Sequence, residues 1–486
     1  MKNKGDSEMY EPLSYDEMYS IHVAASEILE RVGVMIQHDE ALEMLEKAGA
    51  TVNKKTKVAK IPEYLVKDML NKVPCRDLLR ARNPDYNVLI GDGNSYFTNA
   101  FGAHYTIDLE TGERRLATVK DLDEFTLLSD YFSTVDYVKP NILPQEVSQD
   151  ILQQEMALSM FKNTEKHCSV FALTLTGFRD VIEMAKILAG GEDEFIENPS
   201  IIDTGFNNVP PLKYTGEIID MVLECAKYGI PFDISTGALA SASGPVTLAG
   251  MIAQGIAENQ AIVVITELAG PGTPIMWGSC GTILDQRRGT AAYGSPENGL
   301  IHAAFAQMAR YYGLPYYGAA GVIDSKAVDP QAAYENMMNA LIAALAGADV
   351  VHDGVYGILE AGITASYEMF AISHDICSAI KRVAEGFRVT KETLAVDIIE
   401  AVGHGKNHLT SDEGLEFTQK HVREEQWHPL LTDRSSRPDW EARGSKDMVQ
   451  RAHEKVKEIL ESHEVEPLDK DTEEKMKQIV KRAKKG

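Results

Sequence analysis

Residues 315–361 have the sequence PYYGAAGVIDSKAVDPQAAYENMMNALIAALAGADVVHDGVYGILEA, and this stretch decides the fold. It contains two short apolar runs, PYYGAAG from residue 315 and DVVHDG from residue 349, that are typical of buried strands. Between them, PQAAYENMMNALIAALAG begins at a proline and ends at a glycine, as helices commonly do. A strand, a helix and a second strand in this order form one repeat of a parallel α/β sheet.

The same alternation runs through the chain from about residue 95. About eight strands are expected, the number that closes a barrel, so we predict an α/β fold of the (βα)8 TIM-barrel class. A doubly wound open sheet would show the same pattern, because periodicity does not report closure. The predicted strands are YFTNAF near residue 96, VDYVKPNI near 135, HCSVFALT near 167, SIIDTGF near 200, FDIST near 232, PIMWGS near 274, PYYGAAG near 315 and DVVHDG near 349. Predicted helices between them include residues 148–163, 214–229, 297–313 and 330–347.

Both ends of the chain differ from this central pattern. Residues 1–90 predict an N-terminal helical extension, in which Ser14 caps one helix and Asp39 begins another that ends at Gly49. Residues 91–410 predict the barrel domain. Residues 411–486 are polar and rich in charge of both signs, and predict a C-terminal helical arm.

The composition excludes several classes of function. The formal net charge is −25, from 73 acidic and 48 basic side chains in 486 residues, so nucleic acid and anionic membranes would be repelled. The N-terminus has no apolar leader, and no transmembrane segment is expected. The five cysteines are odd in number, widely spaced and without a C-x-x-C pair, which favours a reducing cytoplasm and disfavours a structural zinc site.

Aromatic side chains are frequent where the predicted strands end. In a barrel these ends form the functional face. Aromatic faces attract a quaternary ammonium by about 0.5 to 2 kcal/mol each. The alternative is that the same rings only fill the barrel or its rim. The candidate substrate-binding aromatics are Phe101, Phe206, Trp277, Tyr316, Tyr317 and Tyr356.

Polar candidates lie at the same strand ends. His352 follows the apolar pair of the last strand, and His104 lies after the first. Asp324 could form an ion pair with Lys326 or help to position a substrate, and Glu360 closes the decisive stretch. The chain has none of the motifs H-E-x-x-H, G-x-S-x-G, G-x-G-x-x-G or G-x-x-x-x-G-K-[ST], so common zinc-hydrolase, serine-hydrolase and phosphate-loop chemistry is disfavoured.

The decisive stretch resembles the trimethylamine methyltransferase superfamily, especially its members without pyrrolysine. The resemblance extends over nearly the whole chain through residues 101–130, 268–279 and 427–454. It implies a (βα)8 barrel that passes a methyl group to cob(I)alamin on a separate corrinoid protein, with no tightly bound cofactor and no metal of its own.

Within this resemblance, the position that carries pyrrolysine in trimethylamine enzymes matches Gln331. The chain has only standard residues, which moves the expected substrate to a quaternary amine: glycine betaine, proline betaine, carnitine or γ-butyrobetaine. A quaternary nitrogen leaves as a neutral tertiary amine, so orientation and preorganisation suffice for catalysis.

The expected roles follow from this substrate. The aromatic candidates approach the ammonium, with Gln331 among the substrate-binding residues; His352 orients the substrate, and Glu360 or Asp324 supports the site. For the substrate carboxylate, several partners remain open: His352, His104, a backbone N–H, Arg287 and Arg288.

Two other functions remain as alternatives. One is a zinc-dependent methyltransferase with a thiol acceptor, for which Cys168, Cys225 or Cys280 would bind the metal. The other is a betaine-binding or scaffold protein without catalysis. In each case a homo-oligomer is expected.

Overall fold

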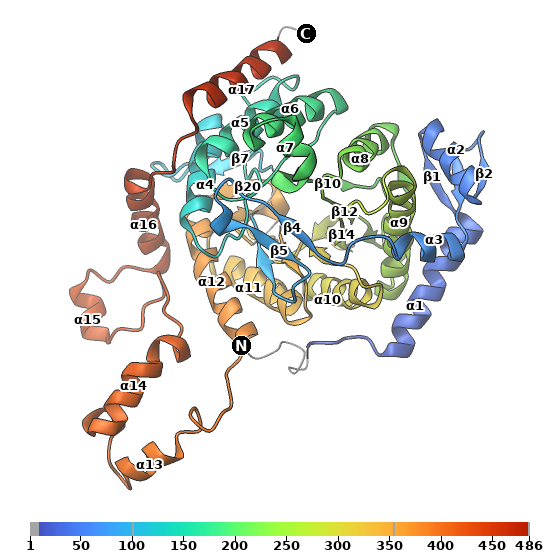
Figure 1. The fold of residues 1–486 in the computed structure, drawn as a ribbon. Helices are drawn as coiled ribbons and strands as arrows, with labels where there is room; N and C mark the ends of the chain where they lie inside the picture. Colours follow the sequence, from blue (N-terminus) through green and yellow to red (C-terminus); the bar gives the residue numbers. More distant parts are fainter. Residues whose placement is uncertain (1–8, 100–101, 353–354, 485–486) are drawn as a thin grey trace.

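A seven-stranded parallel sheet lies at the centre of the molecule (Figure 1). The structure is a computed structural model, and it describes residues 9–99, 102–352 and 355–484. The strands occur in the order β6-β18-β17-β14-β12-β10-β9. Their bounds are β6 Tyr96–Phe97, β9 Cys168–Ser169, β10 Ile202–Asn207, β12 Phe232–Thr236, β14 Ile275–Ser279, β17 Tyr316–Gly318 and β18 Val350–Val351. The predicted α/β class with a parallel sheet is therefore confirmed.

A short segment at residues 137–138 links the two edge strands of this sheet. Thr98, next to β6, forms an isolated parallel bridge with Tyr137, and Val138 forms another with Cys168 of β9. The Ser169 N–H donates to the Val138 carbonyl at 2.8 Å. The strand predicted near residue 135 is thus present as two bridges, and both sheet edges contact it.

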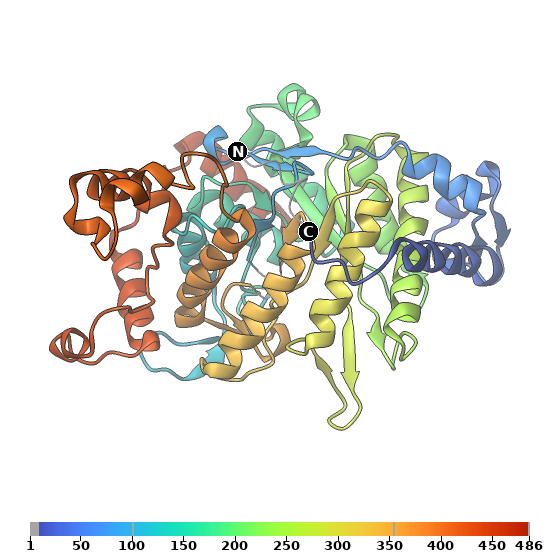
Figure 2. The ribbon, with the colours of Figure 1, turned by 90° about the horizontal axis from the view of Figure 1, so that it is seen from below.

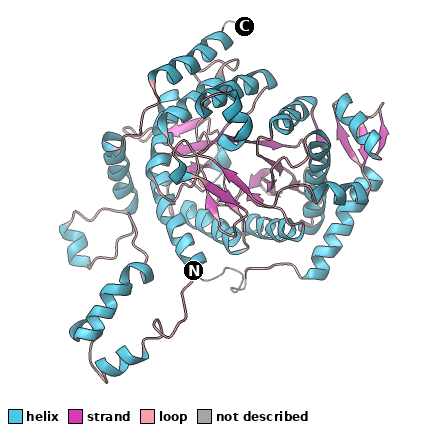
Figure 3. Cartoon of the chain, viewed as in Figure 1, coloured by secondary structure: helices cyan, strands magenta, loops and turns pink. Residues whose placement is uncertain are grey.

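Helices surround the sheet (Figure 3). Their bounds are α4 Val119–Tyr131, α5 Leu152–Asn163, α6 Leu175–Ala189, α7 Glu192–Glu197, α8 Gly216–Tyr228, α9 Leu248–Ala269, α10 Pro296–Tyr311, α11 Pro330–Leu345 and α12 Tyr367–Glu385. The sequence explains their ends: Asp329 accepts a hydrogen bond from the Ala332 N–H at the start of α11, and α8 ends at Gly229 in the left-handed conformation.

Helix α9 is apolar and long enough to cross a membrane by composition alone, but 83% of its most apolar window is buried inside the structure. One of its buried polar side chains bonds within the fold. Glu258 is buried and accepts from the Leu212 N–H at 2.8 Å and from Gln254 at 3.0 Å. Helix α9 is therefore a core helix that packs between the sheet and the N-terminal helices.

The N-terminal region contains strands as well as the predicted helices. Helices α1 (Tyr15–Glu27), α2 (Asp39–Ala48) and α3 (Glu63–Leu70) are joined by β1 (Val34–Ile36), β2 (Thr51–Asn53) and β3 (Val58–Lys60), which form a sheet with β11 (Lys213–Tyr214). The prediction of a purely helical extension was incomplete, because these short strands are not framed by the strand–helix repeat that marks the central sheet.

A hairpin of β4 (Asp77–Leu79) and β5 (Val88–Ile90) covers the amino end of the parallel sheet (Figure 2). Its apolar side chains pack against side chains of the central strands and of the bridging segment at residues 137–138. Leu79, Val88 and Ile90 form one buried cluster with Tyr137, Met276, Tyr317 and Val350.

The opposite, carboxyl edge carries two small sheets. One joins β7 (Tyr105–Ile107) and β8 (Arg114–Leu116) to β19 (Ile358–Leu359) and β20 (Thr364–Ser366). The other contains β13 (Leu239–Ala240), β15 (Thr282–Asp285) and β16 (Thr290–Ala292). The β15–β16 hairpin projects beyond the strand ends, on the side away from the β4–β5 hairpin (Figure 2).

The C-terminal region is helical, with α13 (Val396–Val402), α14 (Asp412–Glu425), α15 (Arg437–Ala442), α16 (Met448–Ser462) and α17 (Lys470–Ala483). Helix α13 lies before residue 411, where the predicted helical arm begins. Helix α16 packs on α12 and α4, and α17 packs on α5 and α6. Helices α13 and α14 project away from the sheet and its surrounding helices (Figure 1).

The buried carboxyl group of Asp77, in the β4–β5 hairpin, makes the fold sensitive to pH. Burial raises its pKa to about 6, and Oδ2 has no hydrogen-bond partner among the described residues. In the unfolded chain the pKa is about 3.9. The ionised carboxylate therefore lowers the free energy of unfolding above pH 6. This destabilisation disappears as the pH falls towards 4.

We predict that Asp77→Asn stabilises the protein at pH 7, by an amount on the order of 2 kcal/mol. Urea unfolding at pH 7 and pH 4.5 measures the effect, and the gain should be much smaller at pH 4.5. The control is Asp85→Asn on the exposed turn between the two strands, which should change neither value. An equal gain at both pH values would contradict this account of Asp77.

Candidate active site at the carboxyl edge of the sheet

Successive side chains along the central strands point in opposite directions. One points toward the surrounding helices, and the next points to the other side of the sheet, here called the interior. In β17, Tyr316 stacks on Phe305 of α10, with ring centroids 6.2 Å apart, and therefore faces the helices. Its neighbour Tyr317 packs with Met276 and Val350 in the interior cluster. The interior positions that follow at the carboxyl edge are the candidates for a site.

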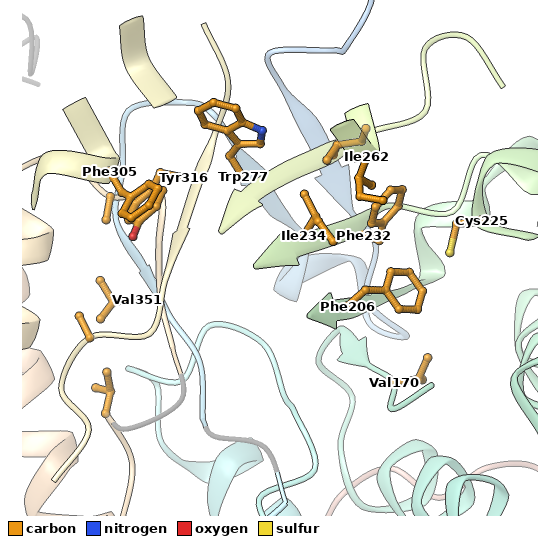
Figure 4. Close-up of a cluster of buried hydrophobic side chains, with 14 of the residues drawn as sticks. Val170, Phe206, Cys225, Phe232, Ile234, Ile262, Trp277, Phe305, Tyr316 and Val351 are labelled. Carbon is orange, nitrogen blue, oxygen red and sulfur yellow. The ribbon is translucent and has the colours of Figure 1, made fainter. Parts of the chain in front are cut away.

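Four of the predicted aromatic residues face the helices. Figure 4 shows Phe206 beside Phe232 and Cys225, and Tyr316 beside Phe305, on the helix-facing side of the strands. Trp277 contacts Tyr312 with ring centroids 4.9 Å apart. Tyr356 lies against Phe370 of α12 at 5.3 Å. All four are buried, and the structure does not bring them together into a cage.

The reason for this difference is the register of the strands. A shift of one residue moves a side chain from one face of a sheet to the other, and the sequence pattern of a strand buried on both faces does not fix that choice. Phe101 lies outside the described residues. His104 is described and exposed at the carboxyl edge, before β7.

Tyr317 and His352 lie together in the interior, as their predicted roles require. Their rings stack with centroids 3.7 Å apart and an angle of 25° between the planes. Both side chains are buried, at 0% and 2% exposure. They come from the ends of the adjacent strands β17 and β18, whose register pairs Tyr317 with Val350.

Lys139 joins this pair and was not predicted. Its Nζ donates to the Tyr317 hydroxyl and lies 4.6 Å from the centroid of the ring. The residue is only 1% exposed. The sequence carried one signal for this residue, a lysine within the apolar run VDYVKPNI. A charged side chain is rarely buried without a specific role or partner. We call Lys139, Tyr317 and His352 the edge cluster.

Further polar groups line the interior below and beside the edge cluster. His167 Nε2 lies 2.9 Å from Asp203 Oδ1, with both side chains fully buried. The Ser235 hydroxyl donates to Asp233 Oδ2 at 3.1 Å. A Cβ atom at Gly278 would lie 2.0 Å from the Ser235 hydroxyl oxygen on the neighbouring strand, so this position favours glycine. None of these polar residues was among the predicted site residues.

Asp324 and Gln331 lie in one hydrogen-bonded group after β17. Asp324 accepts from the N–H groups of Tyr293 and Gly294 at 3.1 and 2.9 Å, and burial raises its pKa. The Gln331 amide donates to Glu335 at 2.6 Å, and Glu335 also accepts from the Asp324 N–H at 2.8 Å. These contacts fix the loop between β17 and α11.

Glu360 and the two predicted arginines lie at the rim. Glu360 forms an ion pair with Arg114 at 3.0 Å and accepts from the Thr364 hydroxyl at 2.8 Å. Its N–H donates to the Ser325 carbonyl at 3.0 Å, which joins the β19–β20 corner to the β17–α11 loop. Arg287 and Arg288 are exposed at the tip of the β15–β16 hairpin, outside the interior.

The cysteines named for a zinc site lie on different elements. Cys168 is in β9, Cys225 is in α8, and Cys280 follows β14. Burial raises the thiol pKa of Cys168 and Cys225, which opposes the thiolate form that binds metal. Within residues 9–99, 102–352 and 355–484, no group of three or more His, Cys, Asp or Glu side chains has an arrangement that could hold a metal ion.

Known proteins match this chain over nearly its full length. The family model described as trimethylamine methyltransferase (MTTB) matches residues 2–486. A trimethylamine methyltransferase of Desulfitobacterium hafniense strain DCB-2 is 36% identical over 467 residues, which cover 96% of this chain and 92% of that protein. A glycine betaine methyltransferase of Desulfitobacterium hafniense strain Y51 is 32% identical over 473 residues, covering 97% and 96%.

Among solved structures, the monomethylamine methyltransferase of Methanosarcina barkeri aligns with 11% identity and a TM-score of 0.48, over 94% of this chain and 96% of that one. The family assignment comes from the sequence matches. Since the family model spans residues 2–486 and relatives above 30% identity align over nearly their full length, this chain belongs to the trimethylamine methyltransferase family.

Proposed function

We propose that this protein removes a methyl group from a small quaternary amine and passes it to cob(I)alamin held by a separate corrinoid protein. The substrate class is the betaines: glycine betaine, proline betaine, carnitine or γ-butyrobetaine. The observation that carries the proposal is the edge cluster, which combines aromatic faces with the ammonium group of Lys139. A zwitterion needs both kinds of group, whereas trimethylamine carries no carboxylate.

Gln331 supports the same choice of substrate. It lies in the first turn of α11, directly after the β17–α11 loop, at the position expected for pyrrolysine in the trimethylamine enzymes. Relatives named for both substrates align with this chain at similar identity, so overall identity does not choose between them. A standard amide here favours a substrate that reacts without a pyrrolysine adduct.

The proposal includes a complete (βα)8 barrel, with its mouth at the carboxyl edge. The two isolated bridges through residues 137–138 support closure, because they connect both edges of the sheet to one segment. In such barrels the chemistry occurs at the carboxyl ends of the strands, where the edge cluster lies. A reducing cytoplasm suits the described cysteines, which form no disulfide.

Within this barrel, the chain's own residues bind and orient the amine. The outer face of the stacked Tyr317–His352 pair contacts the ammonium, since the two inner faces lie against each other, and the Nζ of Lys139 or a ring N–H of His352 binds the carboxylate. Glu360 and Asp324 hold the rim loops in place through their backbone contacts. These contacts direct one methyl group toward the mouth.

The corrinoid would supply the nucleophile that accepts the methyl group when the partner is docked. As the carbon–nitrogen bond breaks, its electron pair stays on nitrogen, and a neutral tertiary amine leaves without needing a proton. The exposed β15–β16 hairpin, with Arg287 and Arg288 at its tip, offers this chain a contact for such a partner beside the mouth (Figure 2).

We predict substrate-dependent methylation of cob(I)alamin by the purified protein with at least one of the four betaines, together with release of the demethylated amine. Visible spectra follow the corrinoid, and mass spectrometry follows the amine. Trimethylamine is the matched control and should give no product. The absence of product with every betaine, with and without a corrinoid protein, would refute the proposal. Stoichiometric zinc with a thiol acceptor, or tight binding without turnover, would favour the alternatives.

Replacing His352 with Ala should lower kcat/KM for the betaine at least tenfold, which corresponds to about 1.4 kcal/mol of lost transition-state stabilisation. The physical reason is the loss of the ring that stacks on Tyr317. His453→Ala, on the partly exposed face of α16, is the matched control and should leave kcat/KM unchanged. Wild-type kinetics in His352→Ala would remove this residue from the site.

Lys139→Met tests which end of the substrate the lysine binds. A lost charge-assisted hydrogen bond is worth about 1.5 to 3 kcal/mol, so KM for a betaine should rise by about tenfold or more. KM for tetramethylammonium, which has no carboxylate, should change much less. Lys227→Met on the exposed end of α8 is the control. An equal change for both substrates would show that Lys139 does not bind the carboxylate.

A further inference from the structure

Glu335, in the second turn of α11, is a buried residue that binds both the β17–α11 loop and the first turn of its own helix. It is 4% exposed. Its Oε2 accepts from the Asp324 N–H at 2.8 Å and from the Ser325 N–H at 3.2 Å. Its Oε1 accepts from the side-chain amide nitrogen of Gln331 at 2.6 Å. One carboxyl group therefore fixes the loop with one oxygen and Gln331 with the other.

The β17–α11 loop lies at the carboxyl edge, beside other segments of the mouth. The Ser325 carbonyl accepts from the Glu360 N–H at the β19–β20 corner at 3.0 Å. Gln331 follows this loop directly and is exposed, whereas Glu335 is buried behind it. One branch of the Gln331 amide therefore faces the buried carboxyl group, and the other faces outward at the mouth.

The chemistry of the carboxylate determines which branch faces outward. An ionised carboxylate only accepts hydrogen bonds, whereas a primary amide has two N–H donors on one branch and an acceptor oxygen on the other. Glu335 therefore binds the NH2 branch of Gln331, and the contact at 2.6 Å joins Nε2 to Oε1. The carbonyl oxygen of Gln331 is the branch that points away from the buried carboxylate.

The backbone of Gly294, in the segment before α10, lies directly against the Glu335 carboxyl group. A Cβ atom at Gly294 would lie 2.3 Å from Cδ of Glu335 and 2.7 Å from each of its oxygens. Gly294 is not among the glycines with a positive φ, so Gly294→Ala would add no backbone strain. A substitution at this position would act on Glu335 through space alone.

The direction of the Gln331 amide matters for a quaternary ammonium. Such a cation has no N–H to donate, and its methyl groups carry part of the positive charge. It therefore attracts the negative end of a carbonyl dipole and repels the positive end of an NH2 group. The opposite orientation of the amide would suit a carboxylate. The contact with Glu335 thus favours the ammonium end of a zwitterion at this position.

We propose that Glu335 is a positioning residue for substrate recognition, which holds the Gln331 amide with its carbonyl oxygen toward the substrate ammonium. This inference rests on the proposed function, which makes a quaternary amine the ligand at the mouth. Positive charge on nitrogen falls as the carbon–nitrogen bond breaks, because the electron pair stays on nitrogen. The carbonyl contact is therefore strongest with the bound substrate, and its loss should raise KM while kcat stays nearly constant.

Glu335→Gln tests this orientation at nearly constant side-chain volume. The new amide keeps its oxygen on the N–H groups of the loop and turns its NH2 group toward Gln331, whose own amide must then flip and point its NH2 group outward. KM for the betaine that the wild type demethylates should rise by about fivefold or more, with kcat within about twofold. Gly294→Ala should have the same effect, because it displaces the carboxyl group of Glu335.

The exchange variant Gln331→Glu/Glu335→Gln is the decisive comparison. Its carboxylate at position 331 accepts from the amide at position 335 with one oxygen and presents the other oxygen to the mouth. KM should return to within about twofold of the wild-type value, a recovery that a merely structural role of Glu335 does not give. Gly244→Ala is the matched control, because the nearest atom to a Cβ there lies 3.5 Å away, and it should change neither KM nor kcat.

The outcomes separate this inference from the proposed function. Wild-type KM in Glu335→Gln or in Gly294→Ala, or an exchange variant no better than Glu335→Gln, overturns the inference and leaves the proposed function standing. Circular dichroism checks the folding of each variant, and Gly294→Ala and the exchange variant carry the test if Glu335→Gln does not fold.

A wild type that demethylates no betaine contradicts the proposed function, and calorimetric titration with tetramethylammonium then decides the inference. Binding that Glu335→Gln weakens and the exchange variant restores supports the role of Glu335. Equal binding by all variants, or no binding by the wild type, overturns it.

Discussion

The alternation of side chains along the short parallel strands is the constraint on which the rest of the structure depends. Each strand sends one residue into the helix-facing core and the next into the interior, and backbone pairing with both neighbours fixes that choice. In β17 this places Tyr316 against Phe305 and Tyr317 against His352. The helix-facing core and the candidate site thus take adjacent residues of the same strand.

The pattern of the sequence was sufficient to locate the strands of the central sheet. The runs near residues 96, 167, 200, 232, 274, 315 and 349 are strands of one parallel sheet, and the run near 135 supplies the bridging segment. These runs are long enough, and distinct enough from the helices between them, to be recognised. Strands such as β1 and β4 escaped because the short runs that contain them are not framed by the strand–helix repeat that marks the central sheet.

The site was predicted less completely, for a different physical reason. Tyr317 and His352 were among the candidates and lie in contact, but Phe206, Trp277, Tyr316 and Tyr356 are on the helix-facing side. All these residues are buried, and both faces of the strands are apolar in part, so hydrophobicity alone could not separate them. Lys139 and the His167–Asp203 pair were missed because their polar contacts come from residues far away in the sequence.

The β4–β5 hairpin has a consequence for the order of events. Leu79, Val88 and Ile90 seal the amino end of the interior against Tyr137, Met276 and Val350. Among the described residues, the carboxyl edge is the end of the interior that this hairpin does not cover. Under the proposed reaction, both reactants use that end, and the docked partner covers it. Under that reaction, an amine that enters before the partner docks and a product that leaves after the partner departs would give compulsory-order kinetics.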